Sequence, residues 1–140
     1  MKIKNYTQLK THAAKLLYEK KYNEELNKTG VFWAFSNNQF QENKIPQNGN
    51  DNEFLSIGMG GYIHKSNKDK LDKFTKEIVP ILKSEFIQNT NRKDHILYEL
   101  LNHESFYSYE IEDVYETLQF YYNDITEEEI LEEFNKYMAS

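Results

Sequence analysis

The sequence predicts an α+β fold in a single domain over residues 1–140, with four to six helices packed on one small β-sheet. Apolar residues recur at helical spacing through most of the chain. Two short runs, Val31–Phe35 and Phe54–Ile57, are instead rich in aromatic and aliphatic residues, which is typical of strands. The length of 140 residues is usual for one domain.

The first helix is expected to run from a cap at Thr7 to about Leu26 and to end before Gly30. Its apolar stripe has three- and four-residue spacing and consists of Leu9, Ala13, Leu16 and Leu17. Ser36 and Gln39 have the spacing of a capping box, which predicts a short helical turn after the first strand. The polar segment Gln41–Asn52 is expected to be an exposed, mobile loop.

A glycine-rich hairpin is expected in the middle of the chain, where Gly58–Gly61 separates Phe54–Ile57 from the extended piece Tyr62–Ile63. These glycines lack the spacing of a phosphate-binding loop. A helix follows, and Pro80 inside it predicts a kink or a junction of two helices. Its stripe comprises Leu71, Phe74, Ile78, Ile81, Leu82 and Phe86.

Three further helices are predicted in the last third of the chain. The helix Asp94–Asn102 has a dense apolar face, which we expect to be largely buried: Ile96, Leu97, Leu100 and Leu101. The next helix is marked by Ile111, Val114 and Leu118. The last begins with a capping box of Thr126 and Glu129, and its inward residues are Ile130, Leu131, Phe134, Tyr137 and Met138.

Charge is distributed unevenly along the sequence. Residues 1–93 hold 16 basic and 10 acidic side chains, whereas residues 94–140 hold 1 and 13. This acidic segment is either a solvated helical surface or a face that docks on a basic partner. The candidate acidic residues for docking are Asp113, Glu116, Asp124, Glu127, Glu128, Glu132 and Glu133. The candidate aromatic residues are Phe106, Tyr107 and Tyr109.

The best candidates for chemistry are His103 and Glu104, with His95 nearby in the sequence, because His and Glu serve as metal ligands or as an acid–base pair. The alternative is that Asn102 and His103 cap a helix. The histidine spacing does not match the helical zinc motif and the chain has no cysteine, so we expect no catalytic residue, metal or cofactor.

Several function classes are disfavoured by composition. No apolar run approaches about 18 residues and no signal sequence is evident, so we expect a cytoplasmic protein without a membrane span. The net charge of −6 argues against direct, sequence-specific binding of nucleic acid.

Three segments carry a resemblance to other proteins: Gly30–Asn37 with Phe40, Gly58–Asn67, and Asn102–Tyr107 with Ile111–Val114. Together they resemble a family of small uncharacterised proteins from phages and mobile elements of AT-rich bacteria. The resemblance transfers no functional residue. It implies a context in which small acidic proteins inhibit host defence, as anti-CRISPR proteins do.

We therefore expect a non-enzymatic inhibitor of this anti-CRISPR-like kind. Its partner would be a host protein with a basic surface, such as a CRISPR effector nuclease or its guide-RNA complex. A small hydrolase-like enzyme that uses His103 and Glu104 is one alternative, and a general protein-interaction module is the other.

Overall fold

The computed structural model describes residues 2–44, 46 and 49–140. It confirms the α+β class, with a mostly helical chain and one small three-stranded antiparallel sheet. The chain divides into two compact units: unit 1 comprises Met1–Tyr18 and Lys83–Ser140, and unit 2 comprises Glu19–Leu82. The single domain expected over residues 1–140 stays a prediction, and each unit is described by itself.

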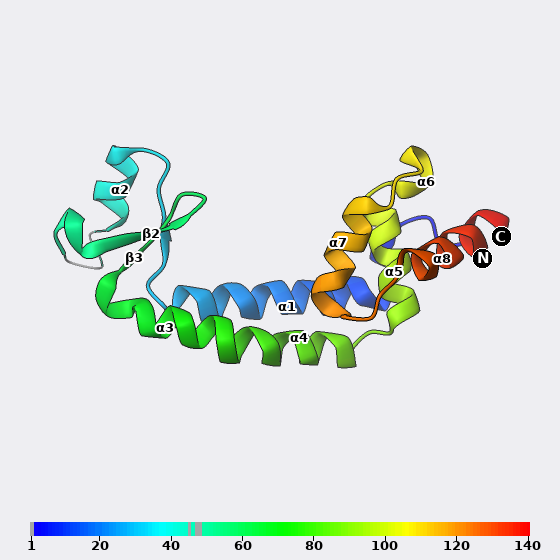
Figure 1. Cartoon of the computed structure of the whole chain (residues 1–140), viewed down its shortest axis with the longest axis horizontal. Coiled ribbons are helices and arrows are strands. Elements are labelled where there is room, and N and C mark those ends of the chain that lie inside the picture. The colour runs from blue at the N-terminus through cyan, green and yellow to red at the C-terminus, as the bar shows by residue number, and fades with distance from the viewer. Residues whose placement is uncertain (1, 45, 47–48) are drawn as a thin grey trace. The chain divides into compact units, whose positions relative to one another are not determined.

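The described ranges hold eight α-helices, and a π-helical segment joins α3 and α4 into one, so there are seven continuous helices, one more than the upper number predicted (Figure 1). The additional one is a single turn, α6. The helices are α1 (Lys10–Asn27), α2 (Asn37–Asn43), α3 (Lys68–Lys73), α4 (Val79–Gln88), α5 (Arg92–Asn102), α6 (Ser105–Ser108), α7 (Glu112–Tyr121) and α8 (Glu127–Ala139). The strands are β1 (Phe32–Trp33), β2 (Phe54–Gly58) and β3 (Gly61–His64).

The core of unit 1 forms where α5, α7 and α8 pack together. Ile96 and Leu100 are completely buried, which confirms the predicted face of α5, and Leu97 and Leu101 are half-buried. Because α5 is surrounded by other elements, polar side chains on its remaining faces are buried as well. The core cluster consists of Ile96, Leu100, Val114, Leu118, Tyr122, Ile125, Ile130 and Phe134.

The N-terminal helix differs from the prediction. Asn5 caps a short 3-10 turn over Tyr6–Gln8, and α1 begins only at Lys10, so Thr7 is not the cap. The expected stripe is also wrong, because Leu16 and Leu17 are 53% and 45% exposed. Helix α1 turns polar side chains inward instead. The Thr11 hydroxyl is buried against the Thr90 hydroxyl at 2.5 Å, and Lys15 pairs with Glu99.

Helix α8 starts as predicted, with the Thr126 hydroxyl accepting the backbone N–H of Glu129 at 3.1 Å. The reciprocal half of the capping box is replaced, because the Glu129 carboxylate accepts hydrogen bonds from Arg92. Leu131 and Met138 are each 43% exposed, so the predicted inward face was too wide. Ile130 and Phe134 are buried and hold α8 on the core.

The sheet of unit 2 has the order β1-β3-β2 with antiparallel neighbours. Strand β2 and strand β3 confirm the predicted hairpin. Strand β1 is shorter than the predicted Val31–Phe35, because Phe35 already belongs to the turn into α2. The backbone N–H of Phe35 donates a hydrogen bond to the Gln39 side chain at 2.8 Å, and Ser36 caps helix α2. One face of the sheet is aromatic and consists of Phe32, Phe54, Tyr62 and His64. Helix α2 packs on it through Phe40, whose ring contacts Phe32, Phe54 and Tyr62.

The hairpin turn needs its glycines. Gly58, Met59 and Gly60 all have positive φ, at 91°, 52° and 82°, and the register shifts between Ser56 and Gly58. Gly60 also lies beneath the Phe35 ring, which a Cβ on Gly60 would approach to 2.5 Å. A tight turn with a bulge is therefore confirmed.

Pro80 is accommodated without a break in the helix. A π-helical segment, Phe74–Ile78, joins α3 to α4 and ends two residues before Pro80, which cannot donate a backbone hydrogen bond. Ile81 is 56% exposed and is not part of the buried stripe.

The segment Gln41–Asn52, predicted to be a loop, is helical at both of its ends. Helix α2 continues through Asn43, and a 3-10 turn begins at Asp51. Residues 45, 47 and 48 of this segment lie outside the described residues.

Candidate functional site

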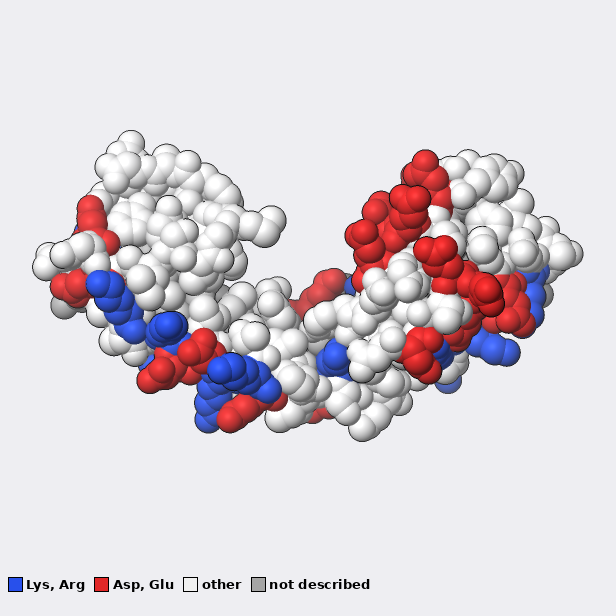
Figure 2. Space-filling view, viewed as in Figure 1, with Lys and Arg blue, Asp and Glu red and all other residues white. Residues whose placement is uncertain are grey.

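Exposed carboxylates gather on unit 1 over α7 and the turn before it (Figure 2). We call this set, Glu110, Glu112, Asp113 and Glu116, the acidic face. Within the described part of the chain, none of the four belongs to an ion pair. Glu112 and Asp113 lie in the first turn of α7, where the helix dipole favours negative charge. The face is therefore stable locally and still presents its charge to solvent.

The structure brings together only part of the acidic set predicted from sequence. Asp113 and Glu116 are on the acidic face, whereas Glu127 and Glu128 are exposed in the first turn of α8. Sequence reasoning missed Glu110 and Glu112. Their signal was their position beside Asp113, just before the apolar stripe of α7 begins.

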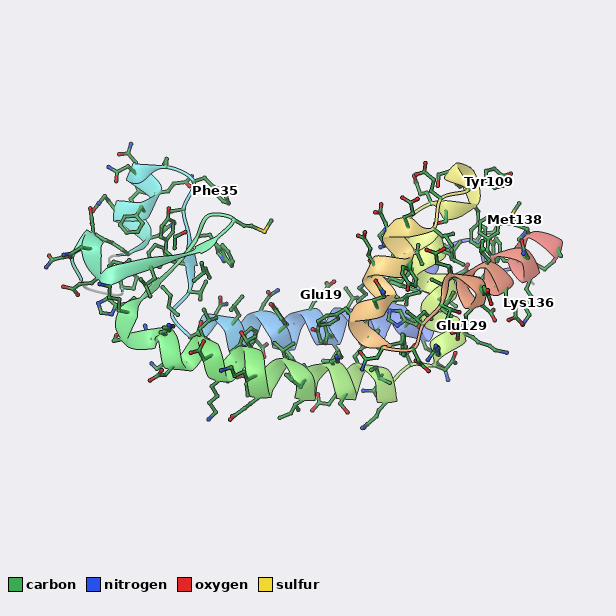
Figure 3. All side chains as sticks on the ribbon, viewed as in Figure 1. Glu19, Phe35, Tyr109, Glu129, Lys136 and Met138 are labelled. Atoms are coloured by element: carbon green, nitrogen blue, oxygen red, sulfur yellow. The ribbon has the colours of Figure 1, made fainter. Side chains whose placement is uncertain are left out.

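Three of the predicted docking residues already have a basic partner within unit 1. Asp124 lies 2.7 Å from Arg92, and Lys136 lies 3.2 Å from Glu132 and 3.5 Å from Glu133. The Glu133 side chain is also only 17% exposed. These carboxylates are partly neutralised, so they lie outside the acidic face as defined above, and their part in docking stays a prediction. Figure 3 labels Lys136, and Glu129, which also binds Arg92.

Two of the three predicted aromatic residues are available to a partner. Tyr107 is 87% exposed, and Tyr109, labelled in Figure 3, is 70% exposed immediately before the acidic face. Phe106 is less accessible, because its ring stacks on Tyr137 and Phe134 with centroid separations of 4.1 and 4.9 Å. Its role is therefore packing. The two exposed tyrosines come just before the carboxylates in sequence and add contact area of the kind that protein interfaces use.

A second notable group is a buried charged cluster around Glu99, whose side chain is completely buried. The Lys15 ammonium lies 2.5 Å from Glu99 Oε1. The Nε2 atoms of His95 and His103 lie 3.4 and 3.3 Å from the Oε1 and Oε2 atoms of the same carboxylate. Four-residue spacing on one helix puts both histidines beside Glu99. The Tyr122 hydroxyl lies 3.0 Å from His95 Nδ1.

The environment of this cluster shifts two pKa values. Burial alone raises the pKa of Glu99, but the neighbouring His95 ring and the hydrogen bond from Lys15 more than offset this, so the pKa lies below its ordinary value. Burial lowers the pKa of His95, and the neighbouring Glu99 carboxylate only partly opposes that shift. The arrangement favours an ionised Glu99 paired with Lys15 beside a neutral His95.

The predicted chemical pair is not assembled. His103 caps α5 and directs its ring to Glu99, whereas Glu104 is exposed in the left-handed region with a φ of 55°. In the part of the chain that is described, neither a hydrogen bond nor an ion pair joins His103 to Glu104. Among the same residues, no group of three His, Cys, Asp or Glu is placed to hold a metal ion. Sequence reasoning missed Glu99, although it lies midway between the two histidines.

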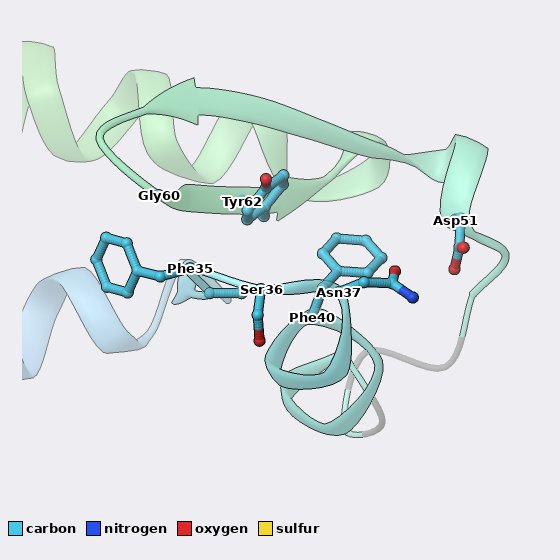
Figure 4. Close-up of a pocket in the computed structure, with 8 residues that line it drawn as sticks. Phe35, Ser36, Asn37, Phe40, Asp51, Gly60 and Tyr62 are labelled. Atoms are coloured by element: carbon cyan, nitrogen blue, oxygen red, sulfur yellow. The ribbon is translucent and has the colours of Figure 1, made fainter.

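Unit 2 carries a recess of about 610 Å³ between the hairpin and α2 (Figure 4). Two sequence segments far apart meet here, Ala34–Phe40 and the turn at Gly60. The lining residues are Ala34, Phe35, Ser36, Asn37, Phe40, Asp51, Gly60 and Tyr62. The one charged residue, Asp51, pairs with Lys44, so the recess is aromatic and largely neutral. Large apolar side chains are exposed near it: Trp33, Phe35, Ile57 and Met59.

In the described residues, no helix has the length and apolar character that crossing a membrane requires.

Comparison with known proteins places the chain in a family but does not assign an activity. Neither a curated protein nor a solved structure matches the chain. One family model matches residues 16–140, which is most of the sequence. The chain therefore belongs to DUF7659, a family of unknown function.

Proposed function

We propose that this protein is a non-catalytic binding protein whose acidic face docks on a basic surface of a protein partner. The observation that carries the proposal is the acidic face itself. It comprises four neighbouring exposed carboxylates without a basic partner in the described part of unit 1. Elsewhere in the same unit, Asp124, Glu129 and Glu132 do have basic partners.

Electrostatics decides what such a face can do. Like charges on adjacent turns repel one another, and a basic partner would relieve that repulsion while gaining attraction. Attraction of this kind raises the association rate more than it raises affinity, and salt weakens it. Tyr107 and Tyr109 supply the apolar contact that charge alone does not provide.

We further propose that the partner is a host protein that handles nucleic acid, and that binding inhibits it in the manner of an anti-CRISPR protein. A nuclease that holds DNA or RNA presents a basic groove, and the acidic face has the complementary charge. The sequence resemblance to phage and mobile-element proteins supports the same assignment. The place of action would be the cytoplasm of the host cell.

The test compares two variants with equal changes in net charge. The first neutralises the acidic face: Glu110→Gln, Glu112→Gln, Asp113→Asn and Glu116→Gln. The control neutralises four exposed carboxylates of unit 2: Glu24→Gln, Glu42→Gln, Asp72→Asn and Glu77→Gln. The wild-type protein and both variants are immobilised and exposed to host extract. The proteins that each of them retains are then quantified by mass spectrometry. Each retained protein is then purified and its association rate is measured.

The proposal predicts a retained protein with a basic surface that wild type and the control bind equally and that the face variant binds much more slowly. Equal binding by all three proteins would contradict it. To test the inhibitor proposal, the nuclease activity of the partner is measured in the presence of each protein. Wild type and the control should inhibit it equally, and the face variant should inhibit it less.

A further inference from the structure

Unit 1 also has a recess of about 360 Å³ where the N-terminal segment lies against α8. Its lining differs in charge from the rest of the unit. Besides Leu101, the residues that line the recess are Lys2, Lys4, Phe106, Tyr107, Tyr137 and Met138. Cavities of this size are typical of sites for small ligands. Figure 3 labels Met138 near the C-terminal end of the chain.

The aromatic floor of this recess is held in place by its neighbours. The Tyr137 hydroxyl donates a hydrogen bond to the Ile3 carbonyl oxygen at 2.5 Å, which fixes the ring against the N-terminal segment. Phe106 stacks on Tyr137 with an interplanar angle of 27° and on Phe134 with an angle of 21°. Phe106 is therefore covered on both faces, and this packing orders the floor of the recess before any ligand binds. A part of the site that is already ordered loses little conformational freedom on binding.

The charged groups of the recess are both positive. The Lys2 ammonium lies 4.4 Å from the centroid of the Tyr137 ring, and Lys4 is exposed at the rim. No carboxylate lines the recess, and in the described residues neither lysine belongs to an ion pair. Unit 1 as a whole holds 8 basic and 14 acidic residues, so a recess with two lysines and no acid is unlike its surroundings.

We infer that this recess binds a small ligand in which a flat aromatic ring is joined to an anionic group. The exposed Tyr107 ring provides the free face on which such a ring stacks. The faces of Phe106 and Tyr137 are already covered, so these rings form the wall beside it. Lys2 and Lys4 provide the charge for a phosphate or carboxylate at the mouth. Each part alone is weak at an exposed site, so recognition depends on both parts in one molecule. None of the four carboxylates of the acidic face lines the recess, which shares only Tyr107 with the proposed docking surface.

The probe is phenyl phosphate, which is added to the full-length protein while amide chemical shifts are recorded by NMR. Inorganic phosphate and benzyl alcohol test the anion and the ring separately. We expect phenyl phosphate to cause saturable shifts at residues 2–4, 106–107 and 137–138. Each half-ligand should bind at least about tenfold more weakly, because it lacks either the charge or the stacking contact.

Two matched variants test the lysines. Lys2→Gln with Lys4→Gln should weaken phenyl phosphate binding by about tenfold or more. Lys10→Gln with Lys93→Gln removes two exposed charges elsewhere in unit 1 and should leave binding unchanged. The inference is overturned if phenyl phosphate causes no saturable shift, or if inorganic phosphate binds as well as phenyl phosphate. Equal binding by the two variants would overturn it as well.

Discussion

The two units bury different kinds of side chain and expose different kinds of surface. Unit 1 has an aliphatic core around Ile96, Leu100 and Val114, all completely buried, and its acidic residues exceed its basic residues by six. Unit 2 holds nine residues of each sign and is built on aromatic contacts such as that of Phe40 with Tyr62. It leaves Phe35 and other large apolar side chains exposed.

This difference has a structural cause. Three packed helices bury the most apolar faces of unit 1 against one another, and the exposed face of α7 carries charged side chains. Unit 1 also exposes single apolar side chains such as Leu16 and Tyr107. A three-stranded sheet with one seven-residue helix over it covers less, and the hairpin end around Met59 stays exposed. The recognition through charge that we propose therefore concerns unit 1, whereas the hairpin end of unit 2 exposes apolar side chains close together in sequence.

Truncation of the unit 1 core should give the largest effect. Leu100→Ala should lower the free energy of unfolding by about 2–5 kcal/mol, because the residue is completely buried among aliphatic neighbours. Ile81→Ala in unit 2 removes a side chain that is 56% exposed and should change it by less than about 0.5 kcal/mol. Chemical denaturation followed by circular dichroism measures both. Similar losses for the two variants would contradict this account of burial.

Removal of the buried Glu99 carboxylate should cause the next largest loss in the free energy of unfolding. Glu99→Gln leaves Lys15 without its ionic partner and should cost about 1–3 kcal/mol. Lys15 retains a side-chain exposure of 17%, which gives it partial access to water and limits the loss. The matched change in unit 2 is Asp51→Asn, which breaks the exposed pair with Lys44 and should leave stability nearly unchanged. Thermal unfolding of the three proteins gives the comparison.

The hairpin of unit 2 should be sensitive at its glycines. Gly60→Ala places a Cβ at positive φ and against the Phe35 ring, whereas Gly58→Ala meets only the backbone strain. Each should cost about 1–2 kcal/mol, because left-handed backbone disfavours residues with a Cβ. Trp33, the only tryptophan, lies in this sheet and reports on unit 2 by fluorescence. Only Gly60→Ala should also alter the native Trp33 emission, since it displaces the neighbouring Phe35.

Acid should destabilise unit 1 through its buried cluster. His95 and Glu99 both have pKa values below their ordinary values of 6.5 and 4.5, so the unfolded chain takes up these protons first as pH falls. The free energy of unfolding should therefore decrease below about pH 6.5 as His95 protonates in the unfolded chain, and again below about 4.5. His95→Gln should remove the first decrease and keep the second. A stability that rises between pH 7 and 5 would contradict the assignment.

Sequence reasoning succeeded where apolar spacing controls the fold. The faces of α5 and α7 are buried as their periodicity predicts, and the glycine turn forms where the glycines are. It failed for α1, because that helix packs through Thr11 and Lys15 rather than through an apolar stripe. Polar contacts of this kind depend on partners about 80 residues away, which spacing does not reveal.

The candidate site was predicted only in part for the same reason. The charge counts located the acidic third of the chain, but Arg92 lies 32 residues from Asp124 and 37 residues from Glu129. Composition does not show which carboxylates such a residue neutralises. Phe106 and Tyr107 are neighbours in sequence, yet one is stacked in the structure and the other is exposed.

The most direct test of the proposed function is the salt dependence of association between the protein and its purified partner. The account predicts that wild type and the unit 2 control associate rapidly at low salt, with rates that fall steeply as salt rises. The variant with a neutralised acidic face should associate slowly and show little dependence on salt. If that variant keeps the wild-type rate and salt dependence, the acidic face has no part in binding, and the account of unit 1 is wrong.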